Sequence, residues 1–287
     1  MAPDIHAQTS TQEATVNAVD YRGRTTLITG ASSGLGAEFA RQLAARGSDL
    51  VLVARREDRL KALAGQLSEA HGVVVETIAM DLSAEGSGEL LAAETERRGI
   101  TVSSVINNAG FGTYGRFHEE DPRRLREETA LNVTAVVDIS RAFIGALRSR
   151  GEGVLVNVAS SAAYQPVPNM AVYGATKAFV LSFTEALWQE SKGTGLRVLA
   201  LSPGATRTEF FDVVGSQDAA AGTRMQTSEV VVRTALRALD RKSPPPSVVS
   251  GALNRIMTLS GRFASRRMVV GIVGRMLSPR SAAPANA

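Results

Sequence analysis

The apolar residues of this chain gather in short continuous runs, separated by longer stretches with helical periodicity. The runs are rich in Val, Leu and Ile, and most lack the alternation of apolar and polar residues that marks a half-exposed strand. Continuous runs of this length are typical of parallel strands that are buried on both faces. They predict strands at residues 25–29, 50–54, 73–79, 102–107, 153–158, 196–202 and 248–250.

Helical segments of ten or more residues lie between these strands. One begins at Asp121-Pro122, where the aspartate suits an N-cap and the proline suits the first turn. Another follows Thr227-Ser228 and carries its apolar residues on one face. Alternating strands and helices predict the α/β class: a single doubly wound domain with a seven-stranded, mostly parallel sheet and helices on both faces.

The chain divides into three parts. Residues 1–22 are polar, lack the basic and apolar regions of a secretory signal, and are interpreted as a weakly ordered leader. Residues 23–251 contain all the predicted strands and form the domain, and residues 252–287 form a basic, amphipathic extension. No run of about 18 apolar residues occurs, so a membrane-spanning helix is not expected.

Composition narrows the chemistry. The chain has no cysteine, which excludes structural disulfides, thiolate catalysis and cysteine zinc sites, and no metal site is predicted. This absence is consistent with a cytoplasmic location. The net charge is +4, but no acidic residue follows Arg241, so the chain before this basic tail is net acidic. A uniformly basic surface for nucleic acid is therefore not expected.

A glycine-rich loop joins the first strand to the first helix. Its sequence is Gly30-Ala31-Ser32-Ser33-Gly34-Leu35-Gly36. Backbone N–H groups at a helix N-terminus favour a pyrophosphate, and glycines allow the close approach. The alternative is a purely structural turn, but its position after the first strand of an α/β pattern favours a dinucleotide site. The candidate ligands are Gly30, Ser32, Ser33, Gly34, Leu35 and Gly36.

The end of the second strand bears on the choice of cofactor. An NAD site usually places an acidic residue here, whereas this chain has Ala54 followed by Arg55 and Arg56. An arginine fork suits a 2′-phosphate, so NADP(H) is favoured. The alternative is a solvated helix start, in which both arginines pair with Glu57 or Asp58.

Asp81-Leu82 follows the third strand. Asp81 has two interpretations, which the sequence leaves open: it accepts a hydrogen bond from an adenine amino group, or it caps the next helix.

Three residues suggest acid–base chemistry. Tyr173 and Lys177 are four residues apart, which places them on one face of a helix. An ammonium beside a phenol lowers the tyrosine pKa and allows proton transfer near neutral pH. Ser160 ends the fifth strand, where it can donate a hydrogen bond to a carbonyl oxygen; the adjacent Ser161 is the alternative. A Tyr-x3-Lys pair alone often occurs by chance. The pair becomes significant here because Ser160 and a glycine-rich nucleotide loop precede it in the chain.

Six motifs in order give the chain a resemblance to the short-chain dehydrogenase/reductase family over about residues 23–250. They are the loop Thr29–Gly36, the Asn107-Asn108-Ala109-Gly110 sequence, Asn132, Ser160, the Tyr173/Lys177 pair, and Pro203-Gly204 with Thr206 and Thr208. The resemblance implies a Rossmann-type fold. It also adds residues to the expected cofactor site: Leu82, Asn108, Ala109, Gly110, Tyr173, Lys177, Pro203, Gly204, Thr206 and Thr208. Some NADP-dependent members carry a basic residue where this chain has Ser33, so the NADP preference rests on Arg55 and Arg56.

The resemblance also implies a reaction. Hydride would pass between nicotinamide and a carbonyl carbon or secondary alcohol. Tyr173 would give or take the proton, Lys177 would hold the nicotinamide ribose, Ser160 would polarise the carbonyl, and Asn132 would extend a proton relay through water. A small-molecule substrate and a homodimer or homotetramer are implied. The alternatives are a non-catalytic NADP-binding regulator, which would be expected to lose one of these residues, and a sugar-nucleotide epimerase of the extended fold.

Two further segments bear on the substrate. Phe210, Phe211, Val213 and Val214 predict an apolar lid, and Tyr164, Pro166 and Pro168 predict another wall, although both groups could simply pack on the domain. In the extension, apolar residues and arginines alternate in one or two predicted helices. Three interpretations are open: cover of the substrate cleft, a subunit interface, or peripheral contact with an anionic membrane.

Overall fold

The computed structural model describes residues 18–220, 223, 225–261 and 264–278. Seven strands form one sheet in the order β3-β2-β1-β4-β5-β6-β7, and all six pairings are parallel. The strands are β1 (Thr25–Thr29), β2 (Asp49–Ala54), β3 (Val75–Ala79), β4 (Val102–Asn107), β5 (Val154–Val158), β6 (Arg197–Ser202) and β7 (Ser247–Val249). The doubly wound fold and its seven strands are confirmed, and the sheet is parallel throughout rather than mostly parallel.

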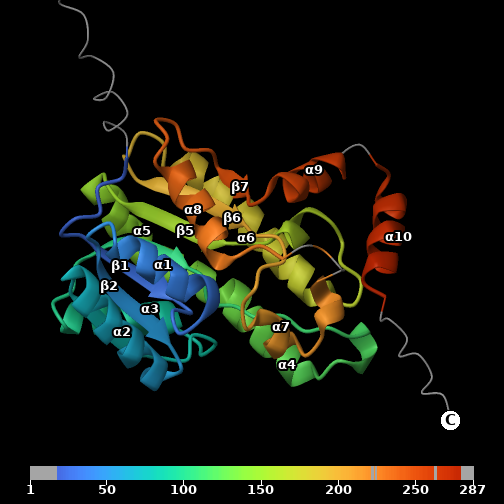
Figure 1. Ribbon diagram of the computed structural model, residues 1–287, viewed down its shortest axis with the longest axis horizontal. Helices are drawn as coiled ribbons and strands as arrows, with labels where there is room; N and C mark the ends of the chain where they lie inside the picture. Colours follow the sequence, from blue (N-terminus) through green and yellow to red (C-terminus); the bar gives the residue numbers. More distant parts are fainter. Residues whose placement is uncertain (1–17, 221–222, 224, 262–263, 279–287) are drawn as a thin grey trace, which may run out of the picture.

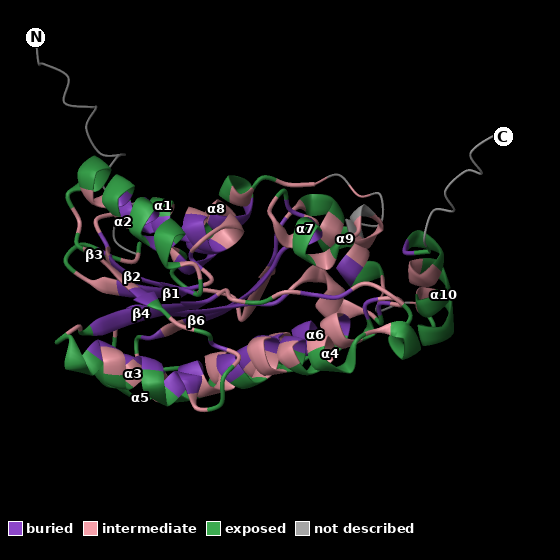
Figure 2. Ribbon diagram, turned by 90° about the horizontal axis from the view of Figure 1, so that it is seen from below, coloured by how far each residue is buried: buried purple, intermediate pink, exposed green. Residues whose placement is uncertain are grey.

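Helices cover both faces of this sheet (Figures 1 and 2). One layer holds α1 (Gly34–Ala44), α2 (Glu57–His71) and α8 (Ser228–Leu239). The other holds α3 (Ser87–Arg97), α4 (Pro122–Thr129), α5 (Ala135–Arg150) and α6 (Ala171–Glu190). Three further helices lie toward one end of the molecule: α7 (Phe210–Val214), α9 (Ala252–Ser260) and α10 (Arg266–Met276).

Each face of the sheet has its own apolar core. Phe39, Leu60 and Leu236 belong to the cluster beneath the α1–α2–α8 layer. Leu91 and Ile139 belong to the cluster on the other face. Because the strands are covered on both sides, their residues are apolar at consecutive positions, which explains why the sequence shows runs rather than alternation.

The start of the domain differs from the expected boundary at residue 23. Tyr21 is only 2% exposed and packs in the first core, with the Arg46 guanidinium 5.8 Å from its ring centroid. The backbone N–H of Val19 donates to Asp240 at 3.2 Å. Residues 18–22 therefore belong to the domain rather than to a weakly ordered leader, and residues 1–17 of that prediction lie outside the described residues.

One helical stretch in the described part of the chain is long and apolar enough to cross a membrane. It runs over Pro122–Arg150, and length and composition are weak evidence because the core helices of soluble domains pass the same test. Its apolar residues pack against the sheet: Ile139, Phe143 and Leu147 are among the buried residues of the second core.

Candidate active site

A cavity of about 660 Å³ opens at the carboxyl ends of the strands, where β1 and β4 lead to helices on opposite faces. This is the position at which doubly wound sheets bind ligands. All but one of the residues predicted to bind the cofactor line it: Gly30, Ser32, Ser33, Gly34, Leu35, Arg55, Arg56, Asp81, Leu82, Asn108, Ala109, Gly110, Tyr173, Lys177, Pro203, Gly204, Thr206 and Thr208. Ser160 and Ser161 line it as well.

The remaining predicted residue, Gly36, lies beneath the loop rather than on the cavity. A methyl carbon at Gly36 would lie 2.3 Å from the Gly30 carbonyl oxygen. Gly30 and Gly34 have φ values of +65° and +55°, which favour glycine. Ser33 is the N-cap of α1, and its side chain makes no capping hydrogen bond. The loop thus leaves N–H groups for an anion, which is what a pyrophosphate requires.

A buried threonine fixes this loop to the next strand. The backbone N–H groups of Asn108 and Ala109 both donate to Thr29 Oγ1 at 3.0 Å, and Asn108 Nδ2 donates to the Thr29 carbonyl oxygen at 2.9 Å. Thr29 is 1% exposed. These bonds hold the ends of β1 and β4 together at the floor of the cavity.

The two arginines after β2 have different surroundings. Arg55 is exposed at the cavity wall, whereas Arg56 donates to Ser32 Oγ at 3.0 Å, to Ser33 Oγ at 3.0 Å and to Glu209 at 2.8 Å. Arg56 therefore ties the glycine-rich loop (residues 30–36, from here on the phosphate loop) to the segment after β6. The alternative pairing of Arg56 with Glu57 or Asp58 does not occur.

Asp81 does not cap the following helix, so that interpretation was wrong. Its Oδ1 accepts from the N–H of Ser83 at 3.0 Å and from Ser83 Oγ at 2.7 Å, and these bonds lower the pKa of Asp81. The N-cap of α3 is Gly86. Asp81 is instead held as an anion at the cavity wall, near Arg55.

Tyr173 and Lys177 lie in the first two turns of α6, on one face. The Lys177 ammonium nitrogen is 5.8 Å from the Tyr173 ring centroid and donates to the Val158 carbonyl oxygen at 3.0 Å. The side chain of Ser160 makes a hydrogen bond with Tyr173, and Ser160 Oγ also accepts from Ala162 N at 3.1 Å. The three groups thus meet in the lining of the cavity.

The pKa of Tyr173 is shifted upward, whereas the sequence predicted a downward shift. Burial raises it to about 12, and the hydrogen bond from Ser160 lowers it only in part. Burial also lowers the pKa of Lys177 to about 8. Because the ammonium is bonded to Val158 and desolvation dominates both groups, Tyr173 is a neutral phenol at neutral pH in this structure.

Asn132 lies behind the cavity rather than on it. It sits in a π-helical turn, Ala130–Thr134, between α4 and α5. Such turns interrupt the regular helical bonding and are frequent at functional sites. Its Nδ2 donates to the Phe111 carbonyl oxygen at 2.8 Å and to Thr176 Oγ1 at 3.2 Å. Asn132 therefore connects the loop after β4 to the helix that carries Tyr173.

The far half of the cavity is apolar. Phe210, Phe211 and Val213 line it as predicted, and the Phe210 ring centroid is 5.3 Å from that of Tyr173. Val214 packs nearby without lining it. The predicted wall of Tyr164, Pro166 and Pro168 was wrong, because the neighbouring residues Gln165, Val167 and Met170 face the cavity instead.

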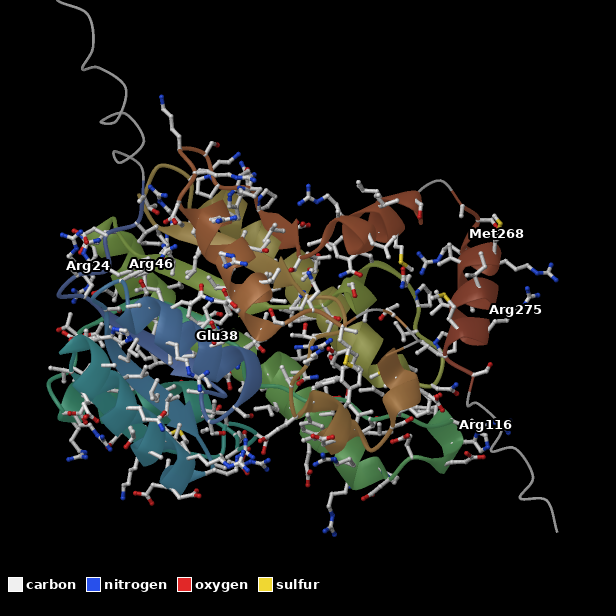
Figure 3. The ribbon with its side chains drawn as sticks, in the orientation of Figure 1. Arg24, Glu38, Arg46, Arg116, Met268 and Arg275 are labelled. Atoms are coloured by element: carbon white, nitrogen blue, oxygen red, sulfur yellow. The ribbon has the colours of Figure 1, made fainter. Side chains whose placement is uncertain are left out.

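The extension forms two helices whose inner side covers this apolar half. Met257, Val269, Ile272 and Val273 contribute to the lining. The end of α10 is anchored at Leu277. The carbonyl oxygen of Leu277 accepts hydrogen bonds from Tyr114 Oη at 2.6 Å and from Asn169 Nδ2 at 3.0 Å. Figure 3 places Met268 and Arg275 on α10, at the end of the molecule opposite Arg24 and Arg46.

Two acidic residues of the site were missed by the sequence analysis. Glu209 pairs with Arg56 and Arg59, 2.8 and 2.5 Å away, and both arginines lower its pKa. Nothing in the sequence links positions this far apart. Glu128 is a fully buried carboxylate one helical turn before Asn132. The sequence did contain a signal for Glu128, because an acidic residue on the buried face of a helix is unusual.

The sequence profile of a family described as short chain dehydrogenase matches residues 24–219. The chain belongs to the short-chain dehydrogenase/reductase family. This confirms the resemblance that the motifs indicate. A homologue from Rattus norvegicus, the very-long-chain 3-oxoacyl-CoA reductase, is 31% identical over 195 residues, which is 67% of this chain. The match spans 62% of that relative's length.

Solved structures of the same family extend the comparison. A short-chain dehydrogenase from Sphingobium yanoikuyae in complex with NADPH is 34% identical, with a TM-score of 0.73 over 92% of this chain and 99% of that one. The bulky-bulky ketone specific alcohol dehydrogenase from Comamonas testosteroni is 30% identical, with a TM-score of 0.70 over 92% and 96% of the two chains. The short-chain dehydrogenase/reductase fold is therefore established for nearly the whole chain.

The close packing of the phosphate loop makes a prediction. Gly36→Ala should weaken NADPH binding roughly tenfold, a loss of about 1.4 kcal/mol, because the new methyl group meets the Gly30 carbonyl and the loop must move. Fluorescence titration measures the affinity. Gly65→Ala is the matched control: no atom lies within 4 Å of its methyl position in α2, so it should stabilise the protein by roughly 0.5–1 kcal/mol and leave binding unchanged. Unchanged binding by Gly36→Ala would contradict this account of the loop.

Proposed function

We propose that this protein is an NADP(H)-dependent reductase of bulky, apolar carbonyl compounds, or a dehydrogenase of the matching secondary alcohols. The observation that carries the proposal is the meeting of Ser160, Tyr173 and Lys177 at the junction of two half-cavities. One half ends in a phosphate loop, and the other is apolar. A non-catalytic regulator would not need all three residues at that junction.

The residues present fit a dinucleotide. The loop of Gly30 to Leu35 would hold its pyrophosphate, and Asp81 and Leu82 would flank its adenine. Arg55 and Arg56 would receive a 2′-phosphate. Thr206 and Thr208 line the cavity where the resemblance implies contact with a nicotinamide carboxamide. When bound, the nicotinamide supplies or accepts a hydride at the carbonyl carbon.

The chain's own residues then handle the proton and the carbonyl. Ser160 would donate a hydrogen bond to the carbonyl oxygen, where negative charge develops. Tyr173 would give its phenolic proton to that oxygen. A neutral phenol is the form that donates, and Tyr173 is in that form at neutral pH. Lys177 and Asn132 would return a proton toward Tyr173.

The apolar half of the cavity supports a large substrate. Val167, Met170 and Phe210 line it beside Tyr173, and the two helices of the extension close it on the outside. The alcohol dehydrogenase from Comamonas testosteroni, which is similar along 92% of this chain, is described as specific for bulky-bulky ketones. A ketone flanked by two large apolar groups is accordingly the substrate class that we infer.

The setting of the enzyme is also a proposal. We infer a cytoplasmic homodimer or homotetramer, as the family resemblance implies. The extension would act mainly as a cover of the cleft, since residues of its two helices line the cavity and Leu277 anchors the end of α10. Peripheral membrane contact through its arginines is a weaker candidate.

The proposal is tested by NADPH consumption with a panel of small aldehydes, bulky ketones, 3-oxoacyl esters and steroids. We expect turnover of bulky ketones by the wild type and a loss on the order of 10³-fold for Tyr173→Phe, which removes the proton donor. Tyr164→Phe is the matched control, because Tyr164 does not line the cavity. Oxidation of NADPH that continues unchanged in Tyr173→Phe would contradict the assigned role.

The hydrogen bond between Ser160 and Tyr173 distinguishes two adjacent hydroxyls. Ser160→Ala should lower kcat on the order of 10²-fold, as loss of one donor to a developing oxyanion does. Ser161→Ala should stay within a few-fold of the wild type. Steady-state kinetics with the best ketone measures both variants, and a larger loss in Ser161→Ala would reverse the assignment.

Two exposed arginines near the cleft, Arg55 and Arg59, allow a test of cofactor choice. Arg55→Asp should lower kcat/KM for NADPH by roughly 10–100-fold, equivalent to one or two charge-assisted hydrogen bonds, and should spare NADH. Arg59→Ala is the control, since Arg59 pairs with Glu209 but lies away from the strand end. The ratio of kcat/KM for the two cofactors is the readout, and an unchanged ratio in Arg55→Asp rejects the NADP assignment.

A further inference from the structure

Glu128 is a buried acid that forms no ion pair within 4.0 Å among the described residues. It lies in α4 and is 0% exposed, and neither carboxylate oxygen makes a hydrogen bond of normal geometry within the part of the chain that the structure describes. Burial raises the pKa of Glu128 to about 7, and the hydroxyl and N–H of Thr113 lower it only in part. A carboxylate buried without an ion pair is costly, so this group carries a proton more readily than a surface glutamate.

Charged groups reach Glu128 from the elements packed around it. Glu120, in the loop before α4, raises its pKa, and the Lys177 ammonium of α6 lowers it. Tyr173, also on α6, has its own pKa raised by Glu128. On α4 itself, Arg124 lies one turn before Glu128, and its guanidinium is stacked 4.0 Å from the Phe111 ring centroid.

Glu128 shares a helix face with a residue of the predicted proton relay. Asn132 follows it by four residues and donates to Thr176 on α6. A methyl carbon at Gly110 would lie 2.7 Å from Asn132 Oδ1 and 3.3 Å from the Lys177 nitrogen. Asn132 and Lys177 therefore converge at Gly110. Helices α4 and α6 pack against each other along a seam, and the Glu128 charge acts across it on both Lys177 and Tyr173.

The proton affinities along this seam have a direction. Tyr173 has a pKa of about 12, Lys177 about 8 and Glu128 about 7. A proton that leaves Glu128 for the Lys177 amine, and then one that leaves Lys177 for a Tyr173 phenolate, each moves to the stronger base. Glu128 and Lys177 hold a proton with similar strength and can exchange one, and Tyr173 is the strongest base of the three.

We propose that Glu128 supplies the proton that restores Lys177 and Tyr173 after each carbonyl reduction; the inference rests on the proposed function. The Tyr173 O–H bond breaks as its proton bonds to the substrate oxygen, which leaves a phenolate. Lys177 releases one N–H proton toward the phenolate through intervening water. The Glu128 carboxyl gives its proton to the Lys177 amine, and solvent returns a proton to the carboxylate past the half-buried Glu120.

The pH profile of the reduction separates this role from simple packing. In the wild type, kcat should fall as pH rises through about 7, because the donor becomes an ionised carboxylate. Glu128→Gln should have a kcat at pH 6 that is lower by roughly tenfold, which is less than the loss of a group acting directly on substrate. The pH dependence that remains should follow Lys177, whose pKa falls below about 8 once the Glu128 charge no longer raises it. KM should change little.

Two matched variants complete the kinetic test. Glu127→Gln alters the neighbouring half-exposed acid on the same helix, which pairs with Arg124 at 3.6 Å, and should keep the wild-type profile. Glu128→Met fills the same space without a titratable group and should reproduce the profile of Glu128→Gln. An active wild type whose pH profile parallels that of Glu128→Gln overturns the relay, and so does a loss of kcat in Glu128→Met with the wild-type pH dependence retained.

A spectroscopic titration without substrate or cofactor tests the proton itself. Infrared difference spectra of the wild type should contain a protonated-carboxyl band that titrates near pH 7, present in Glu127→Gln and absent in Glu128→Gln. Absence of that band from the wild type overturns the inference. If the band is present but the wild type reduces no carbonyl compound in the screen, the proposed function fails and the relay falls with it.

Discussion

The site depends on one buried hydroxyl. Thr29 ends β1 and accepts hydrogen bonds from two consecutive N–H groups after β4. The sheet is wound in opposite directions from these two strands, so their connections diverge and open a crevice. Without a polar tie the diverging loops would leave unpaired N–H groups in a buried place, which is unfavourable. The same tie sets the phosphate loop against Asn108, so the floor of the cleft and its anion site are one unit.

Burial then sets the electrostatics around Tyr173, Lys177 and Glu128. Desolvation raises the pKa of Tyr173, lowers that of Lys177 and raises that of Glu128, and in each case it outweighs the nearby charges. All three groups are thereby shifted toward their neutral forms, as expected where water is excluded. Groups in their neutral forms suit the proton transfer that we propose for this site, and they agree with the apolar lining beyond Tyr173.

The sequence predicted those features that depend on local patterns. The strands were readable because burial on two faces leaves continuous apolar runs, and the phosphate loop because glycine is required at Gly30 and Gly34. Predictions failed where tertiary packing decides. The wall after Ser160 was shifted, since a 3₁₀ turn at Ser161–Tyr164 sets which side chains face the cleft. The sign of the Tyr173 pKa shift was wrong, because the sequence does not give the degree of burial. The partner of Arg56 was missed, because Glu209 lies 153 positions away.

The bridge between Arg56 and Glu209 joins two regions that are usually treated as separate modules. Arg56 contacts the phosphate loop, and Glu209 directly precedes the aromatic residues of α7 that line the apolar half. A loop transplanted after β6 to alter substrate range would also remove the counter-charge of an arginine at the cofactor end. Redesign of coenzyme choice would, in turn, release the loop beside Phe210. Substrate range and coenzyme choice are therefore coupled in this scaffold. Substitutions in the loop after β6 should be selected together with substitutions around Arg56.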